Sequence, residues 1–160
     1  MANAHAGRSP APDHIVDANL VLNRDQAHNE LANISHRELV VQTQENIIEW
    51  LARHGLLHNQ YMCPNCNVFC RLGARNDRID SKRWICRSCN FTKSIRADSF
   101  FEDSKLTLNQ IIDFIYFWSK KLLLSYVMEE TGMKIGILPW IGQISFEIFV
   151  DIGMNYICLQ

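Results

Sequence analysis

Two cysteine pairs constrain this chain more than any other feature of its sequence. Each pair has the form Cys-x-x-Cys and nineteen residues separate them, and the four members are Cys63, Cys66, Cys86 and Cys89. Two such pairs at about this separation are typical of a zinc site with four thiolate ligands. Each short turn directs two sulfurs to one point, and two turns complete a tetrahedron around Zn²⁺. Because four protein ligands leave no position for water or substrate, the sequence predicts a structural rather than a catalytic zinc ion.

Other uses of these cysteines fit the sequence less well. A pair of disulfides would require an oxidising compartment, and residues 1–15 lack the apolar core of a secretory signal. A redox-active Cys-x-x-Cys is expected singly within a βαβ unit, not twice on a short, turn-rich segment. Cys70 could compete as a ligand, although a free, partly buried thiol is the simpler interpretation. Cys158 has no partner pattern.

The cysteine segment is basic, whereas the whole chain is nearly neutral. Eight basic and three acidic residues lie between Cys63 and Asp98, while the chain of 160 residues has a net charge of −1. A small basic module on an otherwise acidic chain favours a polyanionic partner, most often nucleic acid. Charge runs are also often solvated surface, so charge alone leaves both interpretations open. The side chains expected to contact DNA phosphates are Lys82, Arg83, Arg87, Lys93 and Arg96.

The sequence before the cysteines divides into two parts. Residues 1–33 contain too few apolar side chains to offset the entropy of ordering, so a disordered tail is predicted. Residues 34–60 are expected to form a helix that packs on the ribbon. Ser35 and Glu38 make a capping box, and apolar positions at helical spacing predict one continuous helix from Ser35 to Arg53.

Residues 61–98 are predicted to be a zinc ribbon, with short strands at 67–72, 82–85 and 91–95. A module this small cannot fold on its own apolar area, so metal binding is expected to supply its folding free energy. With helices on either side, the expected fold class is a small α+β protein.

Residues 99–133 are predicted to be helical and to resemble a helix-turn-helix. Thr107 and Gln110 make a second capping box, and a wide apolar stripe follows it. Such a stripe is usually core, although self-association through residues 111–118 is a possible use. Residues 134–160 are interpreted as a diverged helical tail. No segment has the roughly 20 uncharged apolar residues of a membrane span, so no membrane contact is expected.

The order of these motifs resembles the N-terminal part of Merlin-type DDE DNA transposases and their bacterial insertion-sequence relatives. The resemblance covers about residues 35–133, and the paired knuckles alone would be generic. The matching runs are Trp84-Ile85-Cys86-Arg87-Ser88-Cys89, Ser94-Ile95-Arg96-Ala97-Asp98-Ser99-Phe100-Phe101, Ser104-Lys105-Leu106-Thr107-Leu108, Tyr116-Phe117-Trp118 and Glu130-Thr131-Gly132-Met133.

This resemblance implies a DNA-recognition front end that would hold transposon ends. In the family a ribonuclease-H-like domain with three metal-binding carboxylates follows, and the 27 residues after Met133 are too few for it. The sequence therefore predicts a zinc-dependent DNA-binding module without strand-transfer activity of its own, nuclear in a eukaryote and otherwise cytoplasmic. The alternatives are a zinc-ribbon module for protein interaction and a fragment of an active DDE transposase.

Overall fold

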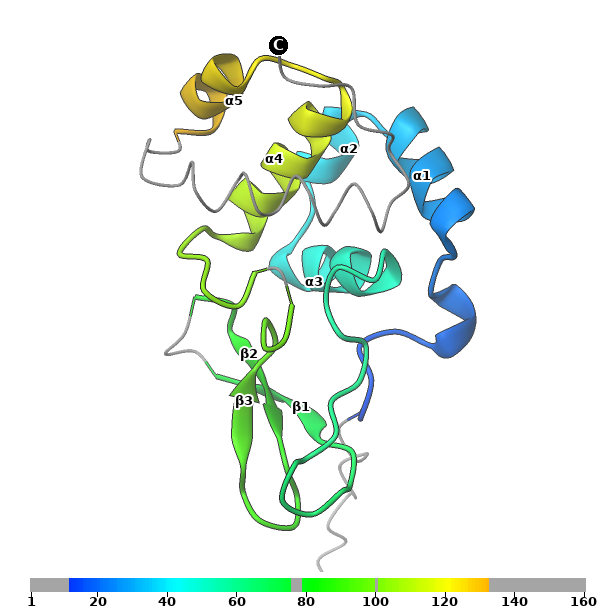
Figure 1. Ribbon diagram of the computed structural model, residues 1–160, viewed down its shortest axis with the longest axis vertical. Coiled ribbons are helices and arrows are strands. Elements are labelled where there is room, and N and C mark those ends of the chain that lie inside the picture. Colours follow the sequence, from blue (N-terminus) through cyan, green and yellow to red (C-terminus); the bar gives the residue numbers. More distant parts are fainter. Residues whose placement is uncertain (1–11, 76–78, 100, 133–160) are drawn as a thin grey trace, which may run out of the picture.

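The computed structural model describes residues 12–75, 79–99 and 101–132, and this part of the chain has a small α+β fold. The helices lie together in the upper part of Figure 1, and the sheet lies below them. The predicted fold class is confirmed. The predicted C-terminal tail of residues 134–160 lies outside the described residues, and so does the start of the predicted N-terminal tail.

Side-chain caps explain where most of the helices begin. The described helices are the 3-10 helix η1 (Ala18–Leu20), α1 (Arg24–Asn33), α2 (His36–Val40), α3 (Gln44–Arg53), α4 (Leu108–Ser119) and α5 (Leu124–Thr131). Asn23, Ser35, Thr43 and Thr107 each accept a hydrogen bond from a backbone N–H in the first turn of α1, α2, α3 and α4, respectively. This satisfies donors that have no partner within the helix. The capping boxes predicted at Ser35 and Thr107 are confirmed.

The prediction of disorder for residues 1–33 is wrong for the part that the structure describes, residues 12–33. The helix α1 begins in a capping box of Asn23 and Gln26 and buries Ala27 and Leu31. Upstream of α1, the backbone of Ile15 and Val16 is held by the side chain of Asn59 through hydrogen bonds of 2.8–3.0 Å. Composition failed here because a short helix needs few apolar side chains when it packs on a core built by other elements.

The predicted helix from Ser35 to Arg53 is two helices, α2 and α3. The helix α2 ends at Val40, and Thr43 then caps the first turn of α3. The break lets Leu39 from α2 and Ile47 from α3 enter the same core. The apolar spacing runs across the break, which is why periodicity alone predicted one helix.

The larger core surrounds α4, which contacts α1, α2, α3 and α5. Its apolar stripe, predicted as core or as a self-association face, is buried within the chain at Leu108, Ile111, Ile112, Phe114 and Ile115. Only the end of the stripe, from Tyr116 to Trp118, is partly buried. Packing inside the chain therefore occupies most of the surface that self-association through 111–118 would need.

The sheet is antiparallel with strand order β1-β2-β3, and its strands are β1 (Arg71–Ala74), β2 (Lys82–Ile85) and β3 (Thr92–Ser94). The second strand has the predicted bounds, and the first begins four residues later than predicted. A glycine is favoured at position 73 in β1 because a Cβ there would lie 2.4 Å from Cδ1 of Ile85 on β2. Among the described residues, no helix is both long enough and apolar enough to span a membrane.

Candidate metal centre

The first cysteine pair lies in a tight turn before β1. The Cys63 N–H donates to the Val68 carbonyl at 2.9 Å, and the Asn67 N–H donates to the Cys63 carbonyl at 2.9 Å. Asn67 has a φ of +52°, in the left-handed region that glycine and asparagine tolerate best. The predicted strand at 67–72 starts late because this turn occupies its first residues.

The second pair lies in an equivalent turn between β2 and β3. The Cys86 N–H donates to the Phe91 carbonyl at 2.8 Å, five residues ahead as in the first turn. Asn90 has a φ of +56°, matching Asn67. Neither asparagine was predicted to be a turn residue, although the sequence contains the signal, since each pair reads Cys-x-x-Cys-Asn. Two turns of the same form thus approach each other from opposite sides.

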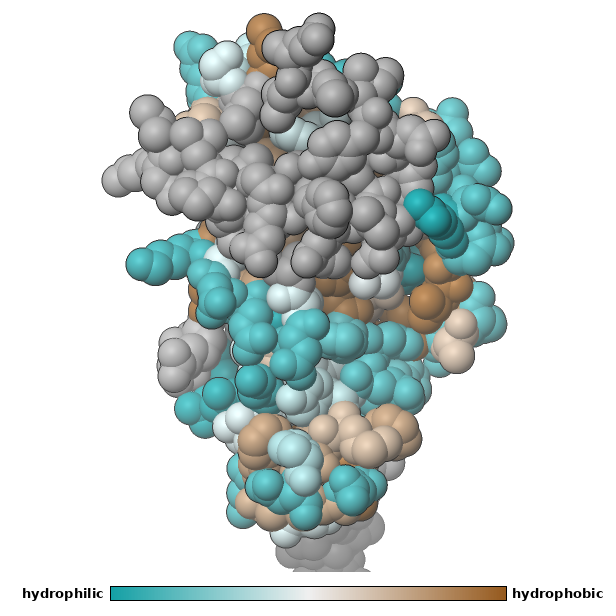
Figure 2. Space-filling view, viewed as in Figure 1, coloured by the Kyte–Doolittle hydropathy of each residue, from teal (hydrophilic) through white to brown (hydrophobic). Residues whose placement is uncertain are grey.

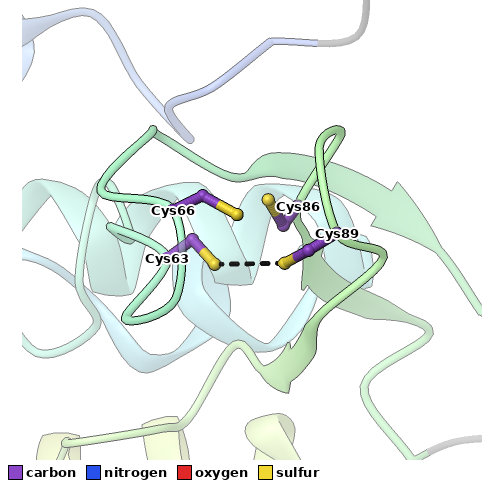
Figure 3. A group of neighbouring side chains, drawn as sticks. All are labelled: Cys63, Cys66, Cys86 and Cys89. Atoms are coloured by element: carbon purple, nitrogen blue, oxygen red, sulfur yellow. Dashed lines mark hydrogen bonds between the residues drawn. The ribbon is translucent and has the colours of Figure 1, made fainter.

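The four predicted sulfurs converge on one point (Figure 3). The ligand atoms of Cys63, Cys66, Cys86 and Cys89 all lie within 4.8 Å of one another, and the Sγ atoms of Cys63 and Cys89 are 3.6 Å apart. A tetrahedral ion with metal–sulfur bonds of about 2.3 Å would place its sulfurs roughly 3.8 Å apart. The cluster has the spacing and the donor set to hold a metal ion.

The surroundings of the four thiols differ. Cys63 and Cys86 are buried, Cys66 is half-buried and Cys89 is exposed. Backbone N–H groups of Cys89 and Ser88 donate to the Cys86 sulfur, with Ser88 N at 3.4 Å, and they lower the pKa of Cys86 to about 6. A hydrogen bond with Cys89, assisted by burial, raises the pKa of Cys66 to about 12. A bound cation would favour deprotonation of all four, because thiolate is the metal-binding form.

Cys70 is close to the cluster but is not among its four members. It is fully buried and packs with Cys63, Trp84 and Cys86 in a small second core. Burial raises the pKa of its thiol to about 11. The geometry agrees with a neutral packing residue, while Cys158 lies outside the described residues.

Comparison with known proteins adds no relative. No family model, curated protein or solved structure matches this chain. The resemblance to transposases therefore stays a prediction.

Arg96 was predicted to contact DNA, and the structure buries it instead. It is 2 % exposed, its Nε donates to Asp80 Oδ2 at 2.7 Å, and its Nη2 donates to Asp80 Oδ1 at 2.5 Å. Its Nη1 donates to the carbonyls of Ser104 and Leu106 at 3.1 and 2.8 Å. A guanidinium has five donors in a fixed fork, and here the fork joins the sheet to the segment before α4. Phosphate has no access to this group, so the prediction for Arg96 is wrong.

The other four predicted basic side chains are at the surface in different settings. Lys82 pairs with Glu45 at 2.9 Å and Lys93 pairs with Glu102 at 3.1 Å. Arg87 is exposed in the second turn. The pKa of Asp13 is lowered mainly by its hydrogen bond with His14, and the positive charge of Arg87 lowers it slightly further. Arg83 is half-buried on β2. The structure brings the metal ligands together but does not gather the five basic residues into one patch.

Proposed function

We propose that this chain is a nucleic-acid-binding module, derived from the front end of a DDE transposase, whose fold depends on one structural Zn²⁺. The observation that supports the metal is the convergence of four sulfurs within 4.8 Å on two matching turns. Support for the partner comes from the basic character of the segment between Cys63 and Asp98 in a chain of net charge −1.

Zinc suits this donor set better than other common ions. Four thiolates in a tetrahedron select zinc or iron, whereas calcium and magnesium prefer oxygen ligands. The test is metal content by mass spectrometry after purification under reducing conditions. One zinc per chain is expected, and a ratio near zero in a folded sample would reject the structural role.

Nucleic-acid binding is tested by the fluorescence anisotropy of a labelled duplex DNA with the zinc-loaded chain. Each phosphate neutralised by Lys or Arg contributes about −0.9 to the slope of log K against log salt concentration. The affinity should therefore fall steeply as salt rises. Absence of binding at low salt, or an affinity indifferent to salt, would reject the proposal.

We infer that the module has no strand-cleavage activity of its own. Paired divalent ions in such reactions need a set of carboxylates. The cysteines are the one group of metal-binding side chains found in residues 12–75, 79–99 and 101–132. Incubation of the zinc-loaded chain with supercoiled DNA and Mg²⁺ or Mn²⁺ tests this inference, and nicking above a Cys63→Ser control would overturn it.

A protein-docking function is a second candidate, because apolar side chains are exposed near the first turn. Met62, Val68 and Phe69 are 52 %, 40 % and 46 % exposed. No charged residue occurs from Asn59 to Cys70. Figure 2 shows apolar surface at the lower end of the molecule, below a mostly hydrophilic band.

Light scattering after size-exclusion chromatography discriminates the two functions. A stable dimer without DNA affinity, dissociated by Met62→Ser with Phe69→Ser, would favour docking. A monomer that binds DNA would favour the first proposal.

A further inference from the structure

The sheet has an inner and an outer face, and the pairing register assigns each residue to one of them. Trp84 is fully buried against the cysteines, so the side of Trp84 and its partner Leu72 is the inner face. Successive side chains of a strand point to opposite sides. The remaining residues form what we name the outer face: Arg71, Gly73, Arg83, Ile85, Thr92 and Ser94.

The outer face presents two arginines that no described acid neutralises. Arg83 is the Cα partner of Gly73, and Arg71 is the Cα partner of Ile85, so the two arginines are diagonal neighbours across β1 and β2. Diagonal neighbours on one face lie roughly 7–8 Å apart, within reach of long side chains. No described carboxylate forms an ion pair with either one, whereas Lys82, Lys93 and Arg96 each have an acidic partner.

Arg83 also carries a buried donor without an acceptor. Its Nε has almost no contact with solvent and no hydrogen-bond partner among the described residues. Buried polar groups in folded proteins are nearly always paired, so an unpaired one needs a reason. Because Nε itself has almost no contact with solvent, an anion would bind the guanidinium through its other nitrogens, and arginine binds phosphate, as it binds carboxylate, with strong charge-assisted hydrogen bonds.

The rest of the outer face is uncharged. The Ile85 side chain occupies the space where a side chain of Gly73 would lie, and it leaves Gly73 buried. Thr92 and Ser94 on the edge strand are exposed. The Ser94 Oγ accepts from the Arg96 N–H at 3.2 Å, which leaves its own O–H available to donate.

We propose that the outer face binds the sugar-phosphate backbone of a nucleic acid, with Arg71 and Arg83 on phosphates and the two hydroxyls beside them. Side chains of these types make most backbone contacts in protein–DNA complexes and carry no sequence information. This inference rests on the proposed nucleic-acid function and adds the surface that performs it.

The test compares two double variants that lose the same charge from different parts of the molecule. Arg71→Gln with Arg83→Gln removes the outer-face charge, and Arg24→Gln with Arg37→Gln removes two exposed charges from the helices α1 and α2. Affinity for one labelled duplex DNA is measured from about 50 mM to about 200 mM salt. The outer-face variant should lose roughly 10- to 100-fold in affinity near 100 mM salt, and its salt slope should be shallower by about 1.8. The helix variant should stay within about threefold of the natural sequence, since salt screens charges that lie away from the bound phosphates.

The outcomes separate this inference from the function on which it rests. If the natural sequence does not bind DNA, the proposed function fails. If it binds and the helix variant loses as much as the outer-face variant, the function stands and the assignment of the face is wrong.

A third variant guards against misfolding of the arginine double variant. Thr92→Glu places a negative charge on the outer face at an exposed position, where the side chain makes no described hydrogen bond that the substitution would remove. It should weaken binding while zinc content and thermal midpoint stay unchanged. Unchanged affinity in a folded Thr92→Glu protein would also overturn the inference.

Discussion

Arg96 and Asp80 form a buried ion pair beside the sheet. Their side chains are 3 % and 6 % exposed, and Arg96 also binds two carbonyls in the segment before α4. A buried pair of this kind adds little stability compared with an apolar pair, but removal of one partner leaves a buried charge without compensation. The arginine therefore matters to the fold rather than to a ligand.

Arg96→Met should lower the free energy of unfolding by about 3–5 kcal/mol, because Asp80 would stay buried without its partner. Urea unfolding of the zinc-loaded protein measures this loss. Lys82→Met is the matched control, since its pair with Glu45 is at the surface and should be worth at most about 1 kcal/mol. Equal losses in the two variants would contradict the burial argument.

His54 is a buried histidine between α3 and α1. Its Nδ1–H donates to the Trp50 carbonyl at 2.7 Å, its ring stacks on Trp50, and its Nε2 lies 3.7 Å from a Glu30 oxygen. Burial lowers the pKa of His54 and outweighs two influences that raise it, the hydrogen bond to the Trp50 carbonyl and the charge of Glu30. In the unfolded chain the pKa of this histidine is near 6.5, so just below that pH the unfolded chain binds more protons than the folded chain.

Stability should therefore fall as pH drops below about 6.5, and this part of the pH dependence should be absent in His54→Gln. An NMR titration of the ring in the zinc-loaded protein gives the pKa directly. A value at or above about 6.5 would mean that Glu30 dominates over burial.

At the scale of elements, the two cysteine turns depend on the residue that follows each pair. Asn67 and Asn90 both have positive φ, a conformation that costs a β-branched residue roughly 1–3 kcal/mol. This strain would oppose formation of the turn and hence the approach of its two sulfurs.

Asn90→Val should weaken zinc binding by roughly 5- to 150-fold, the ratio that corresponds to this strain, whereas Asn90→Gly should stay close to the natural affinity. Competition with a chromophoric chelator measures both affinities. Equal affinities for the valine and glycine variants would show that the left-handed conformation is not required.

Local signals in the sequence were sufficient for some elements and insufficient for others. The cysteine spacing predicted the metal cluster, and Ser35 and Thr107 predicted two helix starts, because each depends on residues close in sequence. The capping box at Asn23 and Gln26 is an equally local pattern, but it was not predicted, because the low apolar content of residues 1–33 indicated disorder. The role of Arg96 was not readable, since its partner Asp80 is sixteen residues away and only the folded chain brings them together.

The whole molecule contains two cores of different kinds. The larger one is built mostly from helices and includes no metal ligand, whereas the smaller one consists of Cys63, Cys70, Trp84 and Cys86. Two of the four residues in the smaller core would bind the metal. Ile15 and Leu72 contact both cores, and the Arg96–Asp80 pair adds a polar link.

Metal removal should therefore unfold the sheet before the helices. On chelation, Trp84 would lose its burial and tryptophan emission should shift to longer wavelength, while most of the helical circular dichroism at 222 nm should persist because the core around α4 needs no metal. Trp84→Phe is the control, because the shift should disappear in it while the other tryptophans remain. Loss of the helical signal in step with the shift would show that the two cores unfold as one cooperative unit. No shift at all, in a sample shown to have lost its metal, would mean that the sulfurs hold their places without an ion.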